Sequence, residues 1–183
     1  MSCFIGVDPG LNGGITIMNN NEIITHVMPI NTFKIKKKEF RYIDNKKLRD
    51  IFLNIYNIKE ANIFIEDIHS LFGMSAKSNF SFGFGYGNLI TTLDVFDLDY
   101  QKVTPKIWQK SVWNSKDIVR GEPFLNKKGI LKDGKIDTKA TSLNAVQRIY
   151  PDLNLLASKR CRVPHDGIVD ATLIMLYGYM QNI

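Results

Sequence analysis

Four acidic residues stand at positions from which their side chains could share metal ions. Asp8 ends a short apolar segment near the start of the sequence, and Glu66 ends another. Asp166 and Asp170 lie four residues apart at the start of a long apolar stretch, so a helix there would place both side chains on one face. Carboxylate oxygens are the ligands that Mg²⁺ and Mn²⁺ prefer in proteins. The four residues therefore predict a site for divalent cations.

The chemistry expected of such a site is phosphodiester hydrolysis. Four carboxylates in one place raise each other's pKa, and only cations keep such a group ionised. Two Mg²⁺ ions about 3.5–4 Å apart can hold both the attacking water and the leaving oxygen of a phosphodiester. We therefore expect a nuclease with two Mg²⁺ ions per site, for which Mn²⁺ can substitute.

Two of the acids, taken alone, have a simpler explanation. Asp8 stands before Pro9 and Gly10, where aspartate commonly forms a turn, and Asp166 could cap a helix. Glu66, at the end of a buried strand, is harder to explain without a partner. The ordered combination of the four acids, rather than any one of them, favours a common site.

The apolar pattern predicts the elements that position these acids. Strands are expected at 3–7, 15–18, 22–28, 62–66 and 100–104. Helices are expected from about 44 to 55 and at 89–96, 106–113, 138–150 and 166–180. The first three strands form an antiparallel meander because tight turns join them. If the first and fourth strands are parallel neighbours, their carboxyl ends bring Asp8 and Glu66 together. This order predicts an α/β fold with a mixed sheet flanked by helices.

In two segments of the sequence, the apolar residues show no clear helical or strand periodicity. Residues 70–88 are rich in Gly, Ser and Phe and are predicted to form a loop. Residues 114–137 are polar and charged, and predict a flexible insertion. A length of 183 residues suits a single domain over 1–183.

The composition favours an intracellular protein that binds a polyanion. The net charge is +6 and the pI about 9.2, which suits nucleic acid or a membrane surface. Two cysteines without a CxxC pattern indicate neither a disulfide framework nor a zinc site. We expect no secretion signal, because Met1 to Asp8 has no basic region, and no membrane span, because no apolar run is long enough.

Basic residues flank the acids along the chain and are predicted to bind phosphates, although a solvated surface is the alternative. They fall in two runs, 34–49 and 127–139, and in a group of three lysines at 102, 106 and 110. The candidates for binding DNA are Lys36, Lys37, Lys38, Lys102, Lys106, Lys110 and Lys139.

An alternating aromatic segment lies within the predicted loop. Its members Phe80, Phe82, Phe84 and Tyr86 are predicted to belong mainly to the core, with stacking on unpaired bases as the alternative. The intervening glycines, at 83, 85 and 87, predict a close approach of backbone.

Three motifs resemble those of the RuvC-type Holliday junction resolvases of the RNase H-like superfamily. Residues 5–14 (IGVDPGLNGG) resemble the opening strand and turn, 64–66 (FIE) the second motif, and 164–171 (PHDGIVDA) the acidic helix. They occur in the family's order and spacing, and the likeness covers nearly the whole chain except 114–137. It is closer to phage, poxvirus-like and mitochondrial relatives than to the bacterial enzyme.

The resemblance implies an RNase H-like fold with a five-stranded mixed sheet, a homodimer, and branched DNA in the form of a four-way junction as substrate. It carries Asp8, Glu66, Asp166 and Asp170 over as catalytic metal ligands. Many bacterial members space the last two acids by three residues rather than four, which makes Asp170 the firmer of the two. His165 stands where a histidine aids catalysis in some relatives, and Lys139 matches a basic position.

The family also has a base-stacking aromatic on the loop after its glutamate. The nearest residues here are His69, Leu71 and Phe72, of which Phe72 is the candidate DNA contact.

The expected function is that of a Mg²⁺-dependent endodeoxyribonuclease that resolves four-way junctions by symmetric paired nicks. It would act in the cytoplasm of a bacterium or a virus-infected cell. The alternatives are an RNase H-like nuclease that cuts RNA–DNA hybrids or flaps, and a non-catalytic junction-binding protein. An actin-like ATPase would need about twice this length. No GxxxxGK[ST] motif is present, so we expect no nucleotide cofactor.

Overall fold

The computed structural model describes residues 3–20, 22–55, 57–69, 73 and 75–182. The strands are β1 (Cys3–Asp8), β2 (Gly14–Asn19), β3 (Glu22–Val27), β4 (Ile30–Ile35), β5 (Lys38–Ile43), β6 (Asn62–Glu66), β7 (Tyr100–Val103), β8 (Phe124–Leu125) and β9 (Leu131–Lys132). The helices are α1 (Asn45–Leu53), α2 (Ala76–Val95), α3 (Pro105–Val112), α4 (Thr138–Ile149) and α5 (Asp166–Gln181), with short 3₁₀ turns η1 (Ile58–Glu60) and η2 (Ser115–Asp117). None of the helices within these ranges combines the length and apolar character needed to cross a membrane.

Five strands form one mixed sheet in the order β3-β2-β1-β6-β7. The first three strands form the antiparallel meander predicted from their tight turns, while β1–β6 and β6–β7 pair in parallel. The predicted α/β fold, with a mixed five-stranded sheet flanked by helices, is confirmed.

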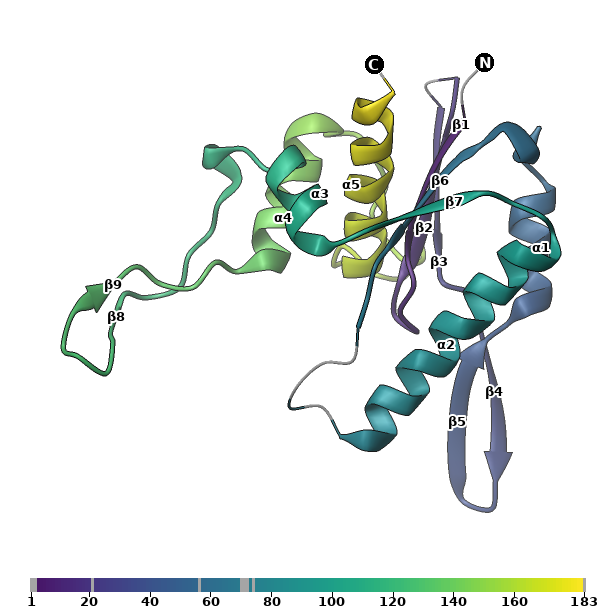
Figure 1. Ribbon diagram of the computed structural model, residues 1–183, viewed down its shortest axis with the longest axis horizontal. Coiled ribbons are helices and arrows are strands. Elements are labelled where there is room, and N and C mark those ends of the chain that lie inside the picture. The colour runs from purple at the N-terminus through teal and green to yellow at the C-terminus, as the bar shows by residue number, and fades with distance from the viewer. Residues whose placement is uncertain (1–2, 21, 56, 70–72, 74, 183) are drawn as a thin grey trace.

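Helices cover both faces of this sheet, as Figure 1 shows: α3, α4 and α5 lie on one side, and α1 and α2 on the other. Successive strand residues point to opposite faces, so each strand supplies both layers. In β1, Phe4 packs with the α5 side and Ile5 with the α1–α2 side. In β6, Phe64 and Ile65 divide in the same way. Buried apolar side chains on both faces explain why these strands are almost continuously hydrophobic.

Helix α5 lies directly on the central strand. A methyl group added at Gly6 of β1 would come within 2.1 Å of the Ala171 carbonyl oxygen. The hydroxyls of Thr16 and Thr172 meet 3.1 Å apart in the same interface, and Thr172 also donates to the Ile168 carbonyl. The last helix is therefore held against the first two strands by contacts that leave no room for adjustment.

The β4–β5 hairpin was not predicted from the sequence. Its six-residue strands pair in antiparallel register, with Phe33 opposite Phe40, and it projects away from the sheet beside α2 (Figure 1). The turn places Lys36 at a φ of 55°. Most of the basic run at 34–49 therefore lies on a projecting hairpin rather than on a helix.

The predicted loop at 70–88 is wrong from residue 76 onward, because α2 begins at Ala76. Ser75 caps the helix, and its side chain accepts a hydrogen bond from the Ser78 backbone N–H. The predicted close approach at the three glycines is also wrong. A methyl group at Gly83 or Gly87 would meet nothing within 4 Å, and one at Gly85 would make only ordinary contacts.

The predicted core role of the aromatic segment fails at two of its four members. Phe80 and Phe84 are 74% and 53% exposed, because helical spacing turns both rings to the same outward face. Phe82 and Tyr86 are partly buried, and Tyr86 packs against the α1–α2 side of the core. Two large aromatic rings are thus left in solvent beside the hairpin.

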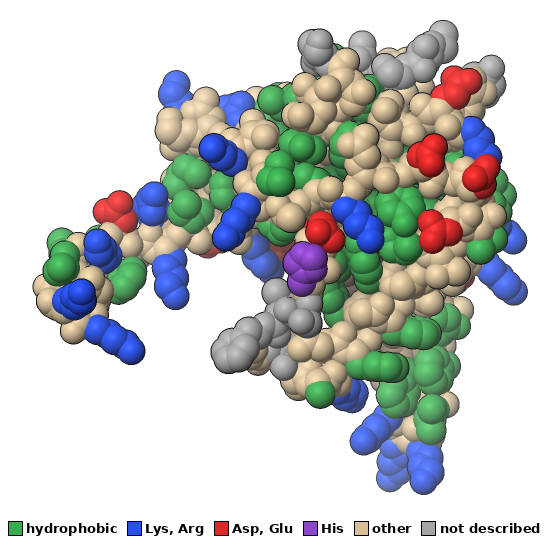
Figure 2. Space-filling model, viewed as in Figure 1, with side chains coloured by type: hydrophobic (Ala, Val, Ile, Leu, Met, Phe, Trp, Pro, Cys, Tyr) green, Lys and Arg blue, Asp and Glu red, His purple; other side chains and the backbone are tan. Residues whose placement is uncertain are grey.

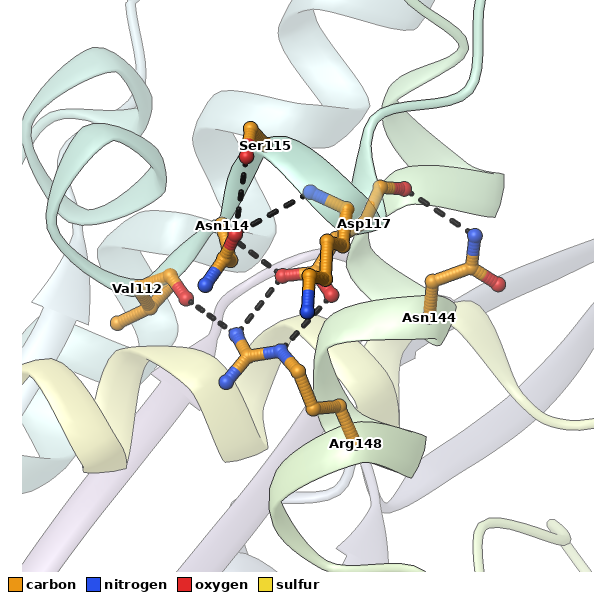
Figure 3. Close-up of polar contacts among 7 residues, drawn as sticks. Val112, Asn114, Ser115, Asp117, Asn144 and Arg148 are labelled. Carbon is orange, nitrogen blue, oxygen red and sulfur yellow. Dashed lines mark hydrogen bonds and ion pairs between the residues drawn. The ribbon is translucent and has the colours of Figure 1, made fainter.

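The segment 114–137 carries regular structure although its sequence shows no period. It contains η2, an isolated bridge between Arg120 and Ile136, and the short β8–β9 hairpin, which extends from the body in Figure 1. At its base, the buried Asp117 carboxylate accepts two hydrogen bonds from the Arg148 guanidinium, at 2.8 and 2.7 Å (Figure 3). The first residues of the segment are therefore tied to α4. Its flexibility stays a prediction.

Candidate active site

Asp8 and Glu66 reach the same edge of the sheet because their strands are parallel neighbours. Val7 pairs with Ile65 in the β1–β6 register, so the acids that follow them end side by side. Both side chains are partly buried. Ligands of open α/β sheets usually lie beyond such carboxyl ends.

Three glycines let the start of α5 approach this edge. Gly13, in the turn after β1, forms an isolated bridge with Gly167. A methyl group at Gly14 would lie 2.5 Å from the Gly167 carbonyl oxygen, and one at Gly167 would lie 2.4 Å from that of Asn12. Only residues without a side chain allow this contact. As a result, Asp166 and Asp170 stand beside Asp8.

The cap of α5 is His165 rather than Asp166. The His165 Nδ1 accepts a hydrogen bond from the Ile168 backbone N–H at 3.4 Å, and Asp166 is the first residue of the helix. The capping explanation considered for Asp166 therefore does not apply. Asp170 follows one turn later on the same face.

Three of the four acids have strongly raised pKa values. Burial, then the charge of Glu66, raises the pKa of Asp8 to about 7, against a hydrogen bond from the Gly10 backbone N–H that lowers it. Burial raises the pKa of Glu66 to about 7, and Asp170 adds to the effect. The sequence argument named mutual repulsion as the cause, whereas in the structure burial is the larger one.

The pKa of Asp170 is also set by opposing effects. Burial, followed by the charge of Asp8, raises its pKa to about 7, while the Ser142 hydroxyl and the Lys139 ammonium act in the opposite direction. Asp166 also raises it. Each of the four acids thus interacts electrostatically with at least one other, as members of one site do.

Trp108 is a site residue that the sequence argument missed. Trp108 belongs to α3, its ring is buried, and its indole Nε1–H donates to the Glu66 Oε1 at 3.0 Å. This hydrogen bond lowers the pKa of Glu66 and fixes the direction of its carboxylate. A tryptophan three residues after Pro105, at the start of the helix that follows the last strand, was the available signal.

Lys139 contributes the positive charge nearest to the acids. Its ammonium forms an ion pair with the Asp166 carboxylate, and both side chains are more than half exposed to solvent. Asp166 is in turn a cause of the raised pKa of Lys139. The predicted basic position on α4 therefore lies at the site, where it already neutralises one carboxylate.

A cleft of about 690 Å³ opens over Asp8, Asp166 and Asp170, whereas Glu66 is not among its lining residues. One wall is formed by the β1–β2 turn and α5, with Asp8, Asp166 and Asp170, and the other by α2, with Lys77 and Phe82. The donor set is purely of oxygen, which fits Mg²⁺ or Mn²⁺. As the side chains lie, no three His, Cys, Asp or Glu residues within the described ranges are arranged to hold one metal ion.

The remaining predicted contacts are distributed around this cleft. His165 lines a neighbouring pocket of about 740 Å³, between the β1–β2 turn and α1, rather than the cleft. Lys36, Lys37 and Lys38 lie at the tip of the β4–β5 hairpin, and Figure 2 shows Lys and Arg side chains at the ends of both projecting hairpins. Phe72 lies outside the described residues.

Three further lysines lie on the β7–α3 side of the molecule. Lys102 of β7 is exposed and stands 5.4 Å from the centre of the Tyr86 ring. Lys106 and Lys110 are exposed on α3. The structure therefore separates them from the cleft, which none of the three lines.

No protein-family model matches the chain, and a comparison with curated protein sequences finds no match. The fold is similar to that of a solved structure of T. thermophilus RuvC in complex with Holliday junction substrate, with a TM-score of 0.52 and 10% identity over 98% of this chain and 96% of that chain. A second Thermus thermophilus RuvC structure has a TM-score of 0.49 and 12% identity over the same shares. The chain thus has a RuvC-like fold, while the phage- and poxvirus-like branch stays a prediction.

Proposed function

We propose that the protein is a divalent-metal-dependent endonuclease that cuts branched DNA at four-way junctions. The observation that carries the proposal is the convergence of Asp8, Glu66, Asp166 and Asp170 at one edge of a RuvC-like sheet, where all but Glu66 line a cleft bordered by cationic side chains. The similar T. thermophilus RuvC was solved with a Holliday junction, and its fold extends over nearly the whole of this chain.

The four carboxylates would hold two Mg²⁺ ions. When bound, the ions supply neutralising charge, activate water and stabilise the leaving oxygen of a phosphodiester. With pKa values near 7, Asp8, Glu66 and Asp170 must give up protons on binding the cations. Trp108 keeps the Glu66 carboxylate directed through the hydrogen bond to its Oε1.

The cationic and capping residues have separate roles in this proposal. Lys139 exchanges Asp166 for a phosphate oxygen of the bound strand, because an ammonium on a flexible stem can move between the two anions. His165 keeps the first turn of α5 in place and so supports catalysis by position. Hydrolysis would leave 5′-phosphate and 3′-hydroxyl ends that ligase can seal.

Resolution of a junction requires two cuts, and this chain supplies one group of four acids. We infer that a two-fold dimer presents two such sites, related by the symmetry of the junction, and makes symmetric paired nicks. The setting we propose for this reaction is the cytoplasm of a bacterium or a virus-infected cell.

The test is incubation of the purified protein with synthetic four-way junctions, flaps, RNA–DNA hybrids and linear duplex, each in Mg²⁺, Mn²⁺ or EDTA. We expect paired, ligatable nicks in the junction only when metal is present, and a dimer by light scattering. Preferential cutting of hybrids or flaps would replace the junction substrate by one of those. Tight junction binding without cutting in either metal would mean a non-catalytic binding protein.

A further inference from the structure

A third pocket, of about 240 Å³, opens between the β4–β5 hairpin and the first half of α2. Its walls are mainly aromatic, with Phe33, Phe40 and Tyr42 from the hairpin and Phe80 and Phe84 from the helix. The nuclease chemistry proposed above uses none of these rings. Their position therefore calls for a separate explanation.

Four of the rings form two stacked pairs, in which Phe40 is partly buried and the other three rings are exposed. Phe33 and Phe40 lie 5.2 Å apart and Phe80 and Phe84 6.4 Å apart, each pair with planes at 13°. Phe80, Phe84 and Phe33 are 74%, 53% and 46% exposed. A protein exposes a contiguous group of large aromatic rings mainly where a partner covers it.

Positive charge around the rings identifies the kind of partner. Residues 30–43 contain five Lys or Arg and a single acid. Arg41 lines the pocket, and the Lys77 ammonium lies 5.9 Å from the centre of the Phe40 ring. A second copy of this chain packed on the same face would oppose like charges. A polyanion with flat apolar groups suits both the rings and the cations, and an unpaired nucleic-acid strand is such a partner.

The pocket also adjoins the proposed active site. Leu11 and Ser81 line both the aromatic pocket and the carboxylate cleft. Lys77 lines the cleft as well, so it stands between the acids and the Phe40 ring. A strand with a phosphate in the cleft would therefore have a neighbouring base at the aromatic pocket.

We propose that the pocket between β4–β5 and α2 holds an unpaired base of the DNA strand whose phosphodiester lies in the adjoining carboxylate cleft. This inference rests on the proposed nuclease function and adds a reason for selecting branched DNA, because paired bases within a duplex cannot enter the pocket. Stacking accepts any base, so the pocket selects unpaired structure rather than sequence.

The experiment compares single-stranded and duplex DNA without catalysis. Fluorescence anisotropy in EDTA would give the affinity of wild-type protein and of Phe80→Leu, Phe33→Leu and the double variant for oligo(dT) and for a duplex of equal length. Loss of one stacked base costs about 1–3 kcal/mol, so we expect oligo(dT) binding to weaken about 5- to 150-fold. Duplex binding should change less than about twofold, because the lysines that neutralise phosphates remain.

Phe124→Leu is the matched control, since Phe124 is 44% exposed on the β8–β9 hairpin, away from the pocket, and its affinities should not change. Photo-crosslinking of oligonucleotides that contain 5-iodouracil should label peptides with Phe33, Phe40, Phe80 or Phe84. An equal loss on single strand and duplex, no loss on either, or crosslinks confined to other peptides would overturn the proposal. A variant that turns a dimer into a monomer would show instead that the surface binds a second copy.

Failure of the pocket and failure of the proposed function can be told apart. Wild-type protein that cuts junctions in Mg²⁺, with variants that bind single strands normally, refutes the pocket alone. Wild-type protein that cuts nothing, with variants that selectively lose single-strand binding, refutes the nuclease and leaves a single-strand binding site.

Discussion

The two walls of the carboxylate cleft are built in opposite ways. The wall made by the β1–β2 turn and α5 is packed so tightly that Gly14 and Gly167 have no room for a methyl group. The wall made by α2 also contains glycines, yet Gly83 and Gly87 face open space. One wall holds charged groups at fixed positions, and the other presents aromatic rings and one lysine, Lys77, to solvent.

This difference matches what each wall is proposed to do. Carboxylates that bind cations must be placed to within a fraction of an ångström, and tight backbone contacts provide that placement. A surface that receives a flexible strand needs exposed groups and tolerates small shifts. The comparison therefore predicts that substitutions on the α5 wall affect chemistry and stability strongly, and that those on α2 affect them weakly.

The largest effect is expected from the acids themselves. Asp8→Asn, Glu66→Gln and Asp170→Asn should each reduce junction cleavage by about a thousandfold or more, a loss of ~4 kcal/mol in the activation free energy. Junction binding in gel-shift assays should persist because Lys and Arg provide it. Asp133→Asn, at an exposed acid of the β8–β9 hairpin, is the control. A variant that cuts within tenfold of wild type would remove that acid from the site.

A methyl group on the tight wall is expected to have the next largest effect. Gly167→Ala brings a carbon within 2.4 Å of backbone atoms in the β1–β2 turn, so α5 must move away from β1. The free energy of unfolding in urea should fall by about 3 kcal/mol, and junction cleavage should fall with it. Gly83→Ala serves as the matched control on the other wall. A Gly167→Ala protein as stable and active as wild type would contradict the proposed packing.

A smaller effect is expected at the ion pair that holds α4 behind the tight wall. Asp117→Asn leaves the Arg148 guanidinium without its carboxylate and should lower the free energy of unfolding by about 2 kcal/mol at pH 7. Arg148 is 38% exposed, so the loss should be less than for a fully buried pair.

The loss of unfolding free energy in Asp117→Asn should become smaller as the pH falls. The hydrogen bonds from Arg148 lower the pKa of Asp117 in the folded protein. The contribution is therefore present above the unfolded-state pKa of about 3.9 and disappears as the pH falls through the lower folded value. Urea unfolding at pH 7 and pH 3 should show the variant and wild type converging at the lower pH. A difference that is constant with pH would assign the effect to packing.

The smallest effect, with the opposite sign, is expected on the open wall. Gly83→Ala and Gly87→Ala should each stabilise the protein by about 0.5–1 kcal/mol, because alanine favours the helix and nothing lies within 4 Å of the added methyl group. Thermal unfolding would measure the gain. Destabilisation by either substitution would mean that neighbouring atoms lie close to that glycine. The proposed difference in packing between the two walls would then be wrong.

The sequence predicts the sheet and the acids better than it predicts the open wall. The spacing of apolar residues identifies the buried strands that end in Asp8 and Glu66 and the helix that starts at Asp166, so the positions of these acids follow from the local sequence. The part of helix α2 before Leu89 does not, because its glycines disfavour a helix. Packing of residues such as Leu89 and Leu93 against the sheet overrides that preference.

Two other features depend on tertiary contacts or atypical turn residues. The β4–β5 hairpin turns at Lys36, where Gly or Asn would be the usual signal, and its strands were concealed within a run of charge. The hydrogen bond from Trp108 to Glu66 joins residues 42 positions apart in the chain, so the place of the tryptophan in the sequence does not identify its partner.

The dependence of the site on α5 also has a consequence for biosynthesis. Chains emerge from the ribosome with the N-terminus first, so β1 to β3 are made long before the helix that covers them. Until residues 166–181 are released, the strand carrying Asp8 lacks the partner that buries one of its faces, and the acids at 166 and 170 are absent. The nascent chain should therefore be unable to cut nucleic acid near the ribosome. The same delay leaves one apolar face of the sheet uncovered, so we expect the unfinished chain to expose surface of the kind that chaperones bind.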